Sequence, residues 1–263
     1  MLKTRIYSGI VGVPIVVVLI WLSVPSTAAL VAGAAVIGTY EFHRLTMRAG
    51  GTIIFFFGTI SAVLFVVDAT ILTDMGGPLL AGTILGPLFV LIFLQPKERL
   101  LSDWAWTVAG VLFVAWTLSH AVLLRREPDG TEWLLVAIIL TFVVDSSAYT
   151  VGKLVGKRPM APTISPGKTW EGSLGAFVLV IPAVILLTAL FDLGMGAPEA
   201  AGLGILVGLA AQAGDLVVSM IKRVAGAKDA GGIIPGHGGL LDRLDSLIPV
   251  VVVVYYYLVS GLG

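Results

Sequence analysis

The sequence contains no cysteine and few charged residues. Without cysteine the chain can form no disulfide, no cysteine-based metal site and no thiol nucleophile. Only 12% of the residues are charged and three are histidine, whereas 57% are hydrophobic. A soluble domain of 263 residues would need a polar face on each helix, but most helical windows here are apolar on all sides. These deficits indicate an integral membrane protein.

Long apolar runs recur from one end of the chain to the other, and about 18 or more such residues can cross a bilayer as a helix. The pattern predicts nine spans, at residues 6–23, 27–40, 52–72, 79–94, 104–124, 133–148, 173–193, 200–220 and 244–262. The second run is short, so eight spans and one re-entrant segment remain an alternative. We expect an all-α, polytopic membrane protein with one integral membrane domain, 1–263.

The N-terminal run follows Lys3 and Arg5 and resembles a signal peptide, but it lacks a convincing cleavage site and continues into a second apolar run. Lysine and arginine set the orientation, because cytoplasmic segments are enriched in both. With the N-terminus in the cytoplasm, fourteen of the sixteen basic residues lie inside and only Arg125 and Arg126 lie outside. This split favours an odd number of spans. It also places the longest polar loops, 153–172 and 221–243, in the cytoplasm.

Acids within the predicted spans need an explanation, because ionised side chains are costly in the hydrocarbon region. Asp68 lies near the outer end of a span, where it can reach interfacial water. Asp215 has no basic residue one turn away on its own helix, and it shares a face with Ser219 and Lys222 through i, i+4 and i+7 spacing. Four carboxylates gather on the cytoplasmic side: Asp145, Asp215, Asp242 and Asp245.

The loop that follows Asp215 combines charge with flexible backbone. Residues 219–245, SMIKRVAGAKDAGGIIPGHGGLLDRLD, hold seven of the 32 charged side chains, six glycines and His237. Glycines let the backbone approach an anion closely, and carboxylates with cations suit a metal-bound phosphate. A structural ion-pair network, such as Asp215 with a basic residue at the entry to the last span, is the alternative. His237 could equally be a turn residue, and we take His43 and His120 as structural.

A second polar loop, APTISPGKTWEG at residues 161–172, contains "GKT". A phosphate-binding P-loop needs a glycine five residues before Gly167, and Pro162 stands there, which excludes that motif. We expect Ser165 to cap a helix that starts at Pro166, with Lys168 in its first turn, where free N–H groups favour anions. Glu171 would orient Lys168 or assist a metal. An ordinary basic cytoplasmic loop is the alternative.

The stretch 219–245 resembles the signature of the CDP-diacylglycerol synthases (phosphatidate cytidylyltransferases). Serine, Lys-Arg, Lys-Asp, His-Gly-Gly and Asp-Arg-x-Asp fall in register at Ser219, Lys222, Arg223, Lys228, Asp229, Pro235, His237, Gly238, Gly239, Asp242, Arg243 and Asp245. Residues 145–156, 164–172 and the pair Gly214–Asp215 also resemble polar segments of that family. The similarity is strong in the C-terminal half, so residues 133–263 carry the expected catalytic motifs and the N-terminal half is expected to supply scaffold spans.

The resemblance implies that the chain makes CDP-diacylglycerol and pyrophosphate from phosphatidate and CTP, with Mg²⁺ as cofactor and a second cation left open. It implies metal ligation by Asp215, Asp242, Asp245 and Ser219, and catalytic or phosphate-holding roles for Lys168, Lys222, Arg223, Lys228, Asp229, His237 and Arg243. Expected substrate-binding positions are Ser165, Thr169, Tyr149, Gly238 and Gly239. The expected location is the inner (cytoplasmic) membrane with the site facing the cytoplasm.

The implied partners are CTP, phosphatidate and membrane lipids, with no nucleic acid, and a homodimer stays open. Two other functions compete. A CTP-dependent lipid kinase would transfer the γ-phosphate to a polyprenol or diacylglycerol hydroxyl, so label in the α-phosphate of CTP distinguishes it. An ion-coupled transporter would need a polar path to both faces, but the outer halves of the spans carry almost no charge.

Overall fold

A computed structural model describes residues 2–49, 55–94, 99–233 and 238–261. Contacts within the chain divide it into two compact units. The first unit comprises Met1–Leu123 and Ile221–Asp242, and the second comprises Leu124–Met220 and Arg243–Gly263. Three helices, α6, α9 and α10, run from one unit into the other. This division does not test whether the chain forms one integral membrane domain, which stays a prediction.

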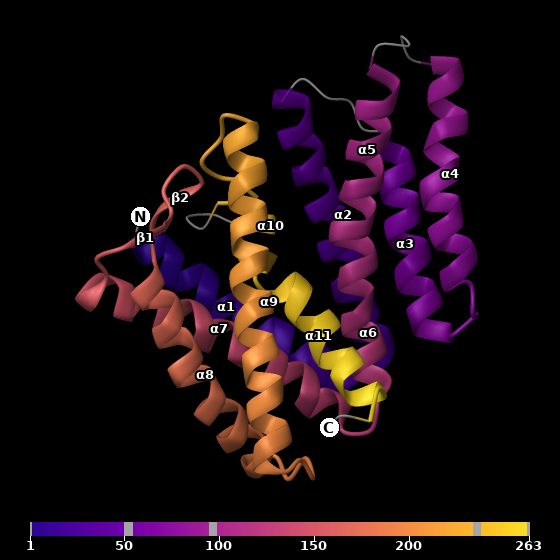
Figure 1. The fold of residues 1–263 in the computed structure, drawn as a ribbon. Coiled ribbons are helices and arrows are strands. Elements are labelled where there is room, and N and C mark those ends of the chain that lie inside the picture. The colour runs from indigo at the N-terminus through magenta and orange to yellow at the C-terminus, as the bar shows by residue number, and fades with distance from the viewer. Residues whose placement is uncertain (1, 50–54, 95–98, 234–237, 262–263) are drawn as a thin grey trace. The chain divides into compact units, whose positions relative to one another are not determined.

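The first unit is a bundle of helices. It contains α1 (Leu2–Leu22), α2 (Val24–Arg48), α3 (Phe55–Ile71), α4 (Gly76–Leu94), α5 (Leu100–Gly110), the π-helical stretch η2 (Val111–Trp116) and most of α6 (Thr117–Arg126). Helices α2, α3, α4 and α5 are neighbours in the bundle (Figure 1). The Ser23 side chain caps α2 by accepting the Ser26 N–H at 3.2 Å. Gly38 lets α2 approach Val114 of η2, because a Cβ there would lie 2.8 Å from a Val114 methyl group.

The second unit is built around two closely packed helices, α7 (Gly130–Val155) and α8 (Trp170–Leu190). A Cβ on Gly175 of α8 would lie 2.7 Å from Val151 of α7, so this crossing needs a residue without a side chain. The unit also holds the strands β1 (Pro159–Ala161) and β2 (Ser165–Thr169), most of α9 (Ala197–Val224) and α11 (Leu247–Val259). The four-residue helix α10 (Leu241–Leu244) precedes α11.

The helices have the composition of membrane-spanning segments. Among the described residues, five helical segments are long and apolar enough to cross a membrane: Gly76–Phe93, Leu100–Arg126, Gly130–Val155, Trp170–Leu190 and Ala197–Val224. Shorter apolar helices cover Gly9–Leu22, Phe55–Ile71 and Leu247–Val259. Large apolar side chains such as Phe93 (83% exposed) and Leu190 (70% exposed) stay outside the protein core, as lipid-facing residues do. The chain is therefore a helical membrane protein.

The described part of each of the nine predicted apolar segments lies mostly on helix, but α2 belongs to neither group of candidate spans. This is the segment that the sequence already marked as short. The count of nine spans stays a prediction.

The expected helix start at Ser165 is wrong. Residues 165–169 form β2, which pairs antiparallel with β1 through Pro159↔Thr169 and Ala161↔Ser165. Thr169 instead caps α8, and its side chain accepts the Gly172 N–H at 3.2 Å. Pro166 is tolerated in β2 because a two-stranded hairpin has only edge strands. Lys168 consequently projects from a strand that leads into the helix, and not from a first helical turn.

Candidate functional site

Asp215 of α9 pairs with Lys168 of β2 in the second unit. Lys168 Nζ lies 2.6 Å from Asp215 Oδ2, and the two side chains are 23% and 30% exposed. Ser219, one turn further along α9, donates its hydroxyl proton to Asp215 Oδ1 at 3.2 Å. The predicted shared face of Asp215 and Ser219 is therefore confirmed. The carboxylate does have a basic partner, but that partner comes from the hairpin, not from its own helix or from the entry to the last span.

Asp145 of α7 lies next to the residues that begin α11. Its Oδ1 accepts the Ser246 hydroxyl proton at 3.0 Å, and the Ser246 N–H donates to Asp245 Oδ1 at 2.8 Å. Gly214 allows α9 to approach this segment, because a Cβ there would collide with the Asp245 carbonyl oxygen and lie 2.7 Å from Pro249 Cγ. The pair Gly214–Asp215, which the sequence singled out, thus combines a close helix crossing with an ion pair.

Asp242 organises the glycine-rich loop in the first unit. Its Oδ1 lies 2.6 Å from Lys222 Nζ, and its Oδ2 accepts the N–H groups of Ala230 at 2.8 Å and Gly239 at 3.0 Å. Only 6% of the Asp242 side chain is exposed. One carboxylate therefore binds the last turn of α9 and two separate backbone N–H groups of the loop.

Glu41 of α2 is a further carboxylate at this loop, and sequence analysis missed it. The residue is completely buried, and its Oε2 accepts the Leu241 N–H at 2.7 Å. Burial raises the pKa of Glu41 above its ordinary value, while the N–H donors of Leu241 and Leu240 oppose this shift. Side chains on Gly231 or Gly239 would overlap the Glu41 carboxylate. Positions 231 and 239 therefore require glycine, because a buried acid lies against the backbone there.

The end of α9 shapes the start of the same loop. Gly226 has φ +62°, and the N–H of Ala227 bonds to the Lys222 carbonyl oxygen at 2.8 Å, which closes the helix with a Schellman-type turn. Arg223 donates from Nη1 to the Ala227 carbonyl oxygen at 3.4 Å. Lys228 and Asp229 are exposed.

Gly238 has φ +85°, a conformation that favours glycine, and a Cβ there would lie 3.3 Å from Asp242 Oδ2. This position therefore favours a residue without a side chain. Pro235, which matches the family signature, and the predicted catalytic residue His237 lie outside the described residues.

The other predicted positions in the second unit lie on α7, β2, α8 and α10, and Arg243 of α10 acts electrostatically on Asp145. Glu171 is not the ion-pair partner of Lys168, which is Asp215. Its Oε2 accepts the N–H groups of Lys157 at 3.1 Å and Arg158 at 3.2 Å, and so holds the start of the hairpin. Tyr149 is 69% exposed, with Lys153 Nζ 5.8 Å from the centre of its ring. Ser165 is half-buried in β2 and Arg243 is exposed.

The carboxylates have the oxygen chemistry that Mg²⁺ prefers. Each carboxylate oxygen can accept two donors, so Asp242 Oδ1 and both Asp215 oxygens keep an acceptor position beside the lysine or serine that each one binds. The described residues contain no group of three or more histidine and acidic side chains placed to hold a metal. The aspartate oxygens therefore fit a cation that is held by one or two carboxylates together with substrate phosphates. Asp242 and Asp215 belong to different units, so a cation shared by the two stays a prediction.

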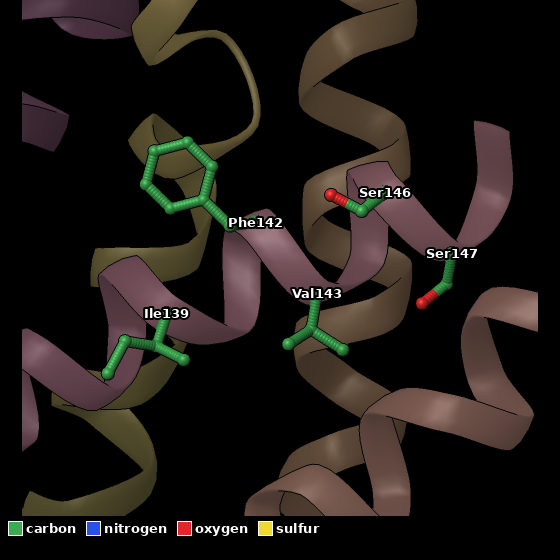
Figure 2. Close-up of a pocket in the computed structure, with 5 residues that line it drawn as sticks. All are labelled: Ile139, Phe142, Val143, Ser146 and Ser147. Carbon is green, nitrogen blue, oxygen red and sulfur yellow. The ribbon is translucent and has the colours of Figure 1, made fainter. Parts of the chain in front are cut away.

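An apolar cavity of about 430 Å³ lies along α7, beside Asp145 in the sequence. Its lining residues are Ile139, Phe142, Val143, Ser146 and Ser147, which Figure 2 shows on successive turns of that helix. Three of the five are hydrocarbon side chains, and the two serines lie at the end nearer to the polar loops along the chain. This surface is therefore mainly apolar, with hydroxyl groups at one end.

Comparisons with known proteins identify the family. The sequence model described as "Cytidylyltransferase family" matches residues 3–260. A phosphatidate cytidylyltransferase of Brucella abortus is 30% identical over 259 residues, which cover 97% of this chain and 93% of the relative. The phosphatidate cytidylyltransferases of Mycobacterium bovis and Mycobacterium tuberculosis are each 42% identical over 158 residues, or 60% of this chain.

The aligned parts differ in extent between these relatives. The matched region spans about half of the mycobacterial proteins, 51% and 48% of their lengths, and nearly all of the Brucella protein. The match of the family model runs through both compact units and contains every predicted site residue. The chain therefore belongs to the cytidylyltransferase family.

Proposed function

We propose that this chain transfers the cytidylyl group of CTP to phosphatidate and releases CDP-diacylglycerol and pyrophosphate. The observation that carries the proposal is the alignment with a phosphatidate cytidylyltransferase over 97% of the chain, together with the family match over residues 3–260. The membrane-spanning composition of the helices supports a lipid substrate, because phosphatidate is held in the bilayer. The apolar cavity along α7 is our candidate for one acyl chain.

In this reaction a phosphate oxygen of phosphatidate attacks the α-phosphorus of CTP. The new phosphorus–oxygen bond forms as the bond from that phosphorus to the β-phosphate oxygen breaks, and pyrophosphate leaves with the electron pair. The attacking oxygen is already anionic at neutral pH, so no strong general base is needed. The main barrier is repulsion between two anions, which cationic side chains reduce.

The chain's own residues would lower this repulsion at two places. Lys168 and Lys222 are each held 2.6 Å from an aspartate, which fixes where their positive charges lie. We propose that both lysines bind phosphate oxygens, with Arg223, Lys228 and Arg243 adding positive charge. Mg²⁺, when bound, would neutralise phosphate charge, with Asp215, Asp242, Asp245 and Ser219 as its ligands. His237 and Asp229 keep their predicted roles in this proposal.

The proposed topology places this chemistry at the cytoplasmic surface of the inner membrane. We propose nine spans with the N-terminus in the cytoplasm, because fourteen of sixteen basic residues then lie inside. Soluble CTP can meet a lipid head group only near the interface, and the predicted site residues lie in the loops and helix ends that this topology places there.

The test is transfer of label from CTP. Purified protein is incubated with phosphatidate, Mg²⁺ and CTP labelled in either the α- or the γ-phosphate, and the lipid products are separated. The proposal predicts α-label in CDP-diacylglycerol and γ-label only in pyrophosphate. Label from the γ-phosphate in lipid would instead show a kinase, and absence of label from lipid in both reactions would contradict both activities.

A further inference from the structure

A second cavity, of about 560 Å³, lies within the first unit, against the glycine-rich loop. It is lined by Arg44 and Arg48 of α2 and by Gly226, Ala227, Lys228, Asp229, Gly231 and Gly232. Its volume falls in the range of small-molecule sites, roughly 300–1,000 Å³. The lining is polar, unlike that of the cavity along α7, so its ligand is expected to be charged.

The charges in this lining favour an anion. Three cations face one carboxylate, that of Asp229. Within the described parts of the chain, Arg44, Arg48 and Lys228 form no ion pair, whereas Lys168 and Lys222 each pair with an aspartate. Arg44 also lies over the Tyr40 ring, 5.9 Å from its centre, and acts electrostatically on Glu41. Unlike the paired lysines, these three cations therefore do not share their charge with an ion-pair partner when a ligand binds.

Glycine backbone forms the other wall. A Cβ on Gly226 or Gly232 would meet nothing within 4 Å, so bare backbone borders open space at these positions. Backbone without side chains can approach phosphate oxygens closely. The wall is also fixed in place, because Glu41 lies against Gly231 and accepts the Leu241 N–H, while Asp242 accepts the Ala230 N–H.

Helix α2 carries both the acid that anchors the glycine wall and the two arginines that line the cavity. Glu41, Arg44 and Arg48 are spaced at i, i+3 and i+7, which places them on one face of the helix. The first residue anchors the loop and the other two line the cavity against it. The position of both arginines relative to the loop is therefore set by the buried Glu41.

We propose that this cavity binds phosphate groups, and specifically the β- and γ-phosphates of CTP and the pyrophosphate formed from them. This rests on the proposed function. Two arginines present planar forks that bind phosphate oxygens in pairs, and a diphosphate offers more oxygens and more negative charge than a phosphomonoester. Binding here would stabilise negative charge on the leaving group. The phosphate of phosphatidate is the other source of the same chemistry, and the experiment separates the two.

The experiment uses purified full-length protein in detergent and the variants Arg44→Gln and Arg48→Gln. The control is Arg99→Gln, which removes an exposed arginine of the first unit that does not line the cavity. Calorimetry with inorganic pyrophosphate alone measures binding without requiring turnover. Steady-state assays then give KM for CTP and KM for phosphatidate separately.

We expect each cavity variant to weaken pyrophosphate binding and to raise KM for CTP about tenfold, as loss of a hydrogen bond to a charged group does. In these variants KM for phosphatidate should stay within about twofold of wild type. In Arg99→Gln the pyrophosphate affinity and both KM values should also stay within about twofold, because no hydrogen bond to a charged ligand is lost. Unchanged pyrophosphate binding in both variants would overturn the proposal, and so would a change confined to KM for phosphatidate. If the wild type makes no CDP-diacylglycerol, the proposed function is refuted. The pyrophosphate measurement would still test whether the cavity binds phosphate groups.

Discussion

Replacement of Glu41 by alanine tests whether a carboxylate in the N-terminal half holds the glycine-rich loop in place. The substitution leaves the buried Leu241 N–H without its acceptor at 2.7 Å. An unsatisfied buried donor costs about 1–3 kcal/mol, and the lost packing of the side chain adds about 1 kcal/mol. Glu41→Ala should therefore lower the free energy of unfolding by about 2–4 kcal/mol and the unfolding midpoint by on the order of 10 °C. It should also lower turnover, because the loop carries the Ala230 and Gly239 N–H groups that hold Asp242.

Two further variants sharpen this test. Glu41→Gln keeps an oxygen for the Leu241 N–H and removes a charge whose burial is unfavourable, so its effect on stability should be below about 1 kcal/mol. Thr46→Val on the same helix is the control, because the buried Thr46 hydroxyl donates to a carbonyl oxygen of its own helix, that of Phe42, at 3.0 Å. Unfolding is followed by intrinsic tryptophan fluorescence on heating in detergent. If Glu41→Ala unfolds and turns over like the Thr46 control, Glu41 does not anchor the loop.

Three other experiments test the hairpin, the close crossing of α9 and the membrane topology. Lys168→Ala should lower turnover at least tenfold, as loss of a charge-assisted contact does. Circular dichroism should show that the variant stays folded. Wild-type activity in this variant would indicate an ordinary basic loop without a role in catalysis. Gly214→Val should lower the unfolding midpoint, since its side chain would collide with the Asp245 carbonyl oxygen and Pro249, and an unchanged midpoint would contradict the close crossing. Single cysteines in this cysteine-free chain should react with an impermeant reagent from outside at Gly130 and only from inside at Gly236; outside labelling of Gly236 would overturn the cytoplasmic site.

The helices and part of the site could be predicted from the sequence because the signals are local. Apolar runs mark segments that must lie in lipid or against other helices, and the described part of each of the nine runs lies mostly on helix. The i, i+4 spacing of Asp215 and Ser219 fixed their shared face, and the hydroxyl does bond to the carboxylate. Regular helix geometry relates such residues without any knowledge of the tertiary fold.

The hairpin and Glu41 could not be predicted because they depend on partners distant in sequence. Ser165–Pro166 is a good helix-start signal, but pairing of Thr169 with Pro159 and the Trp170 N–H bond to the Arg158 carbonyl oxygen overrode it. Glu41 contacts a backbone N–H 200 residues away. Its only signal was one acid at the end of an apolar run, followed by Arg44 and Arg48 at helical spacing. The basic partner of Asp215 was missed for the same reason, since Lys168 lies in another element.

The most direct test of the central claim combines the label-transfer assay with the two carboxylates on which the proposed site depends. CDP-diacylglycerol formation from α-labelled CTP and phosphatidate is measured for wild type, Asp215→Asn and Asp242→Asn across a Mg²⁺ titration. The proposal predicts robust, Mg²⁺-dependent synthesis by the wild type. It predicts near-complete loss in each variant, because each loses a charge and keeps its shape, with at most partial rescue by excess Mg²⁺. Wild-type rates with unchanged Mg²⁺ dependence in Asp215→Asn would show that its pair with Lys168 is structural and would contradict the proposed metal site.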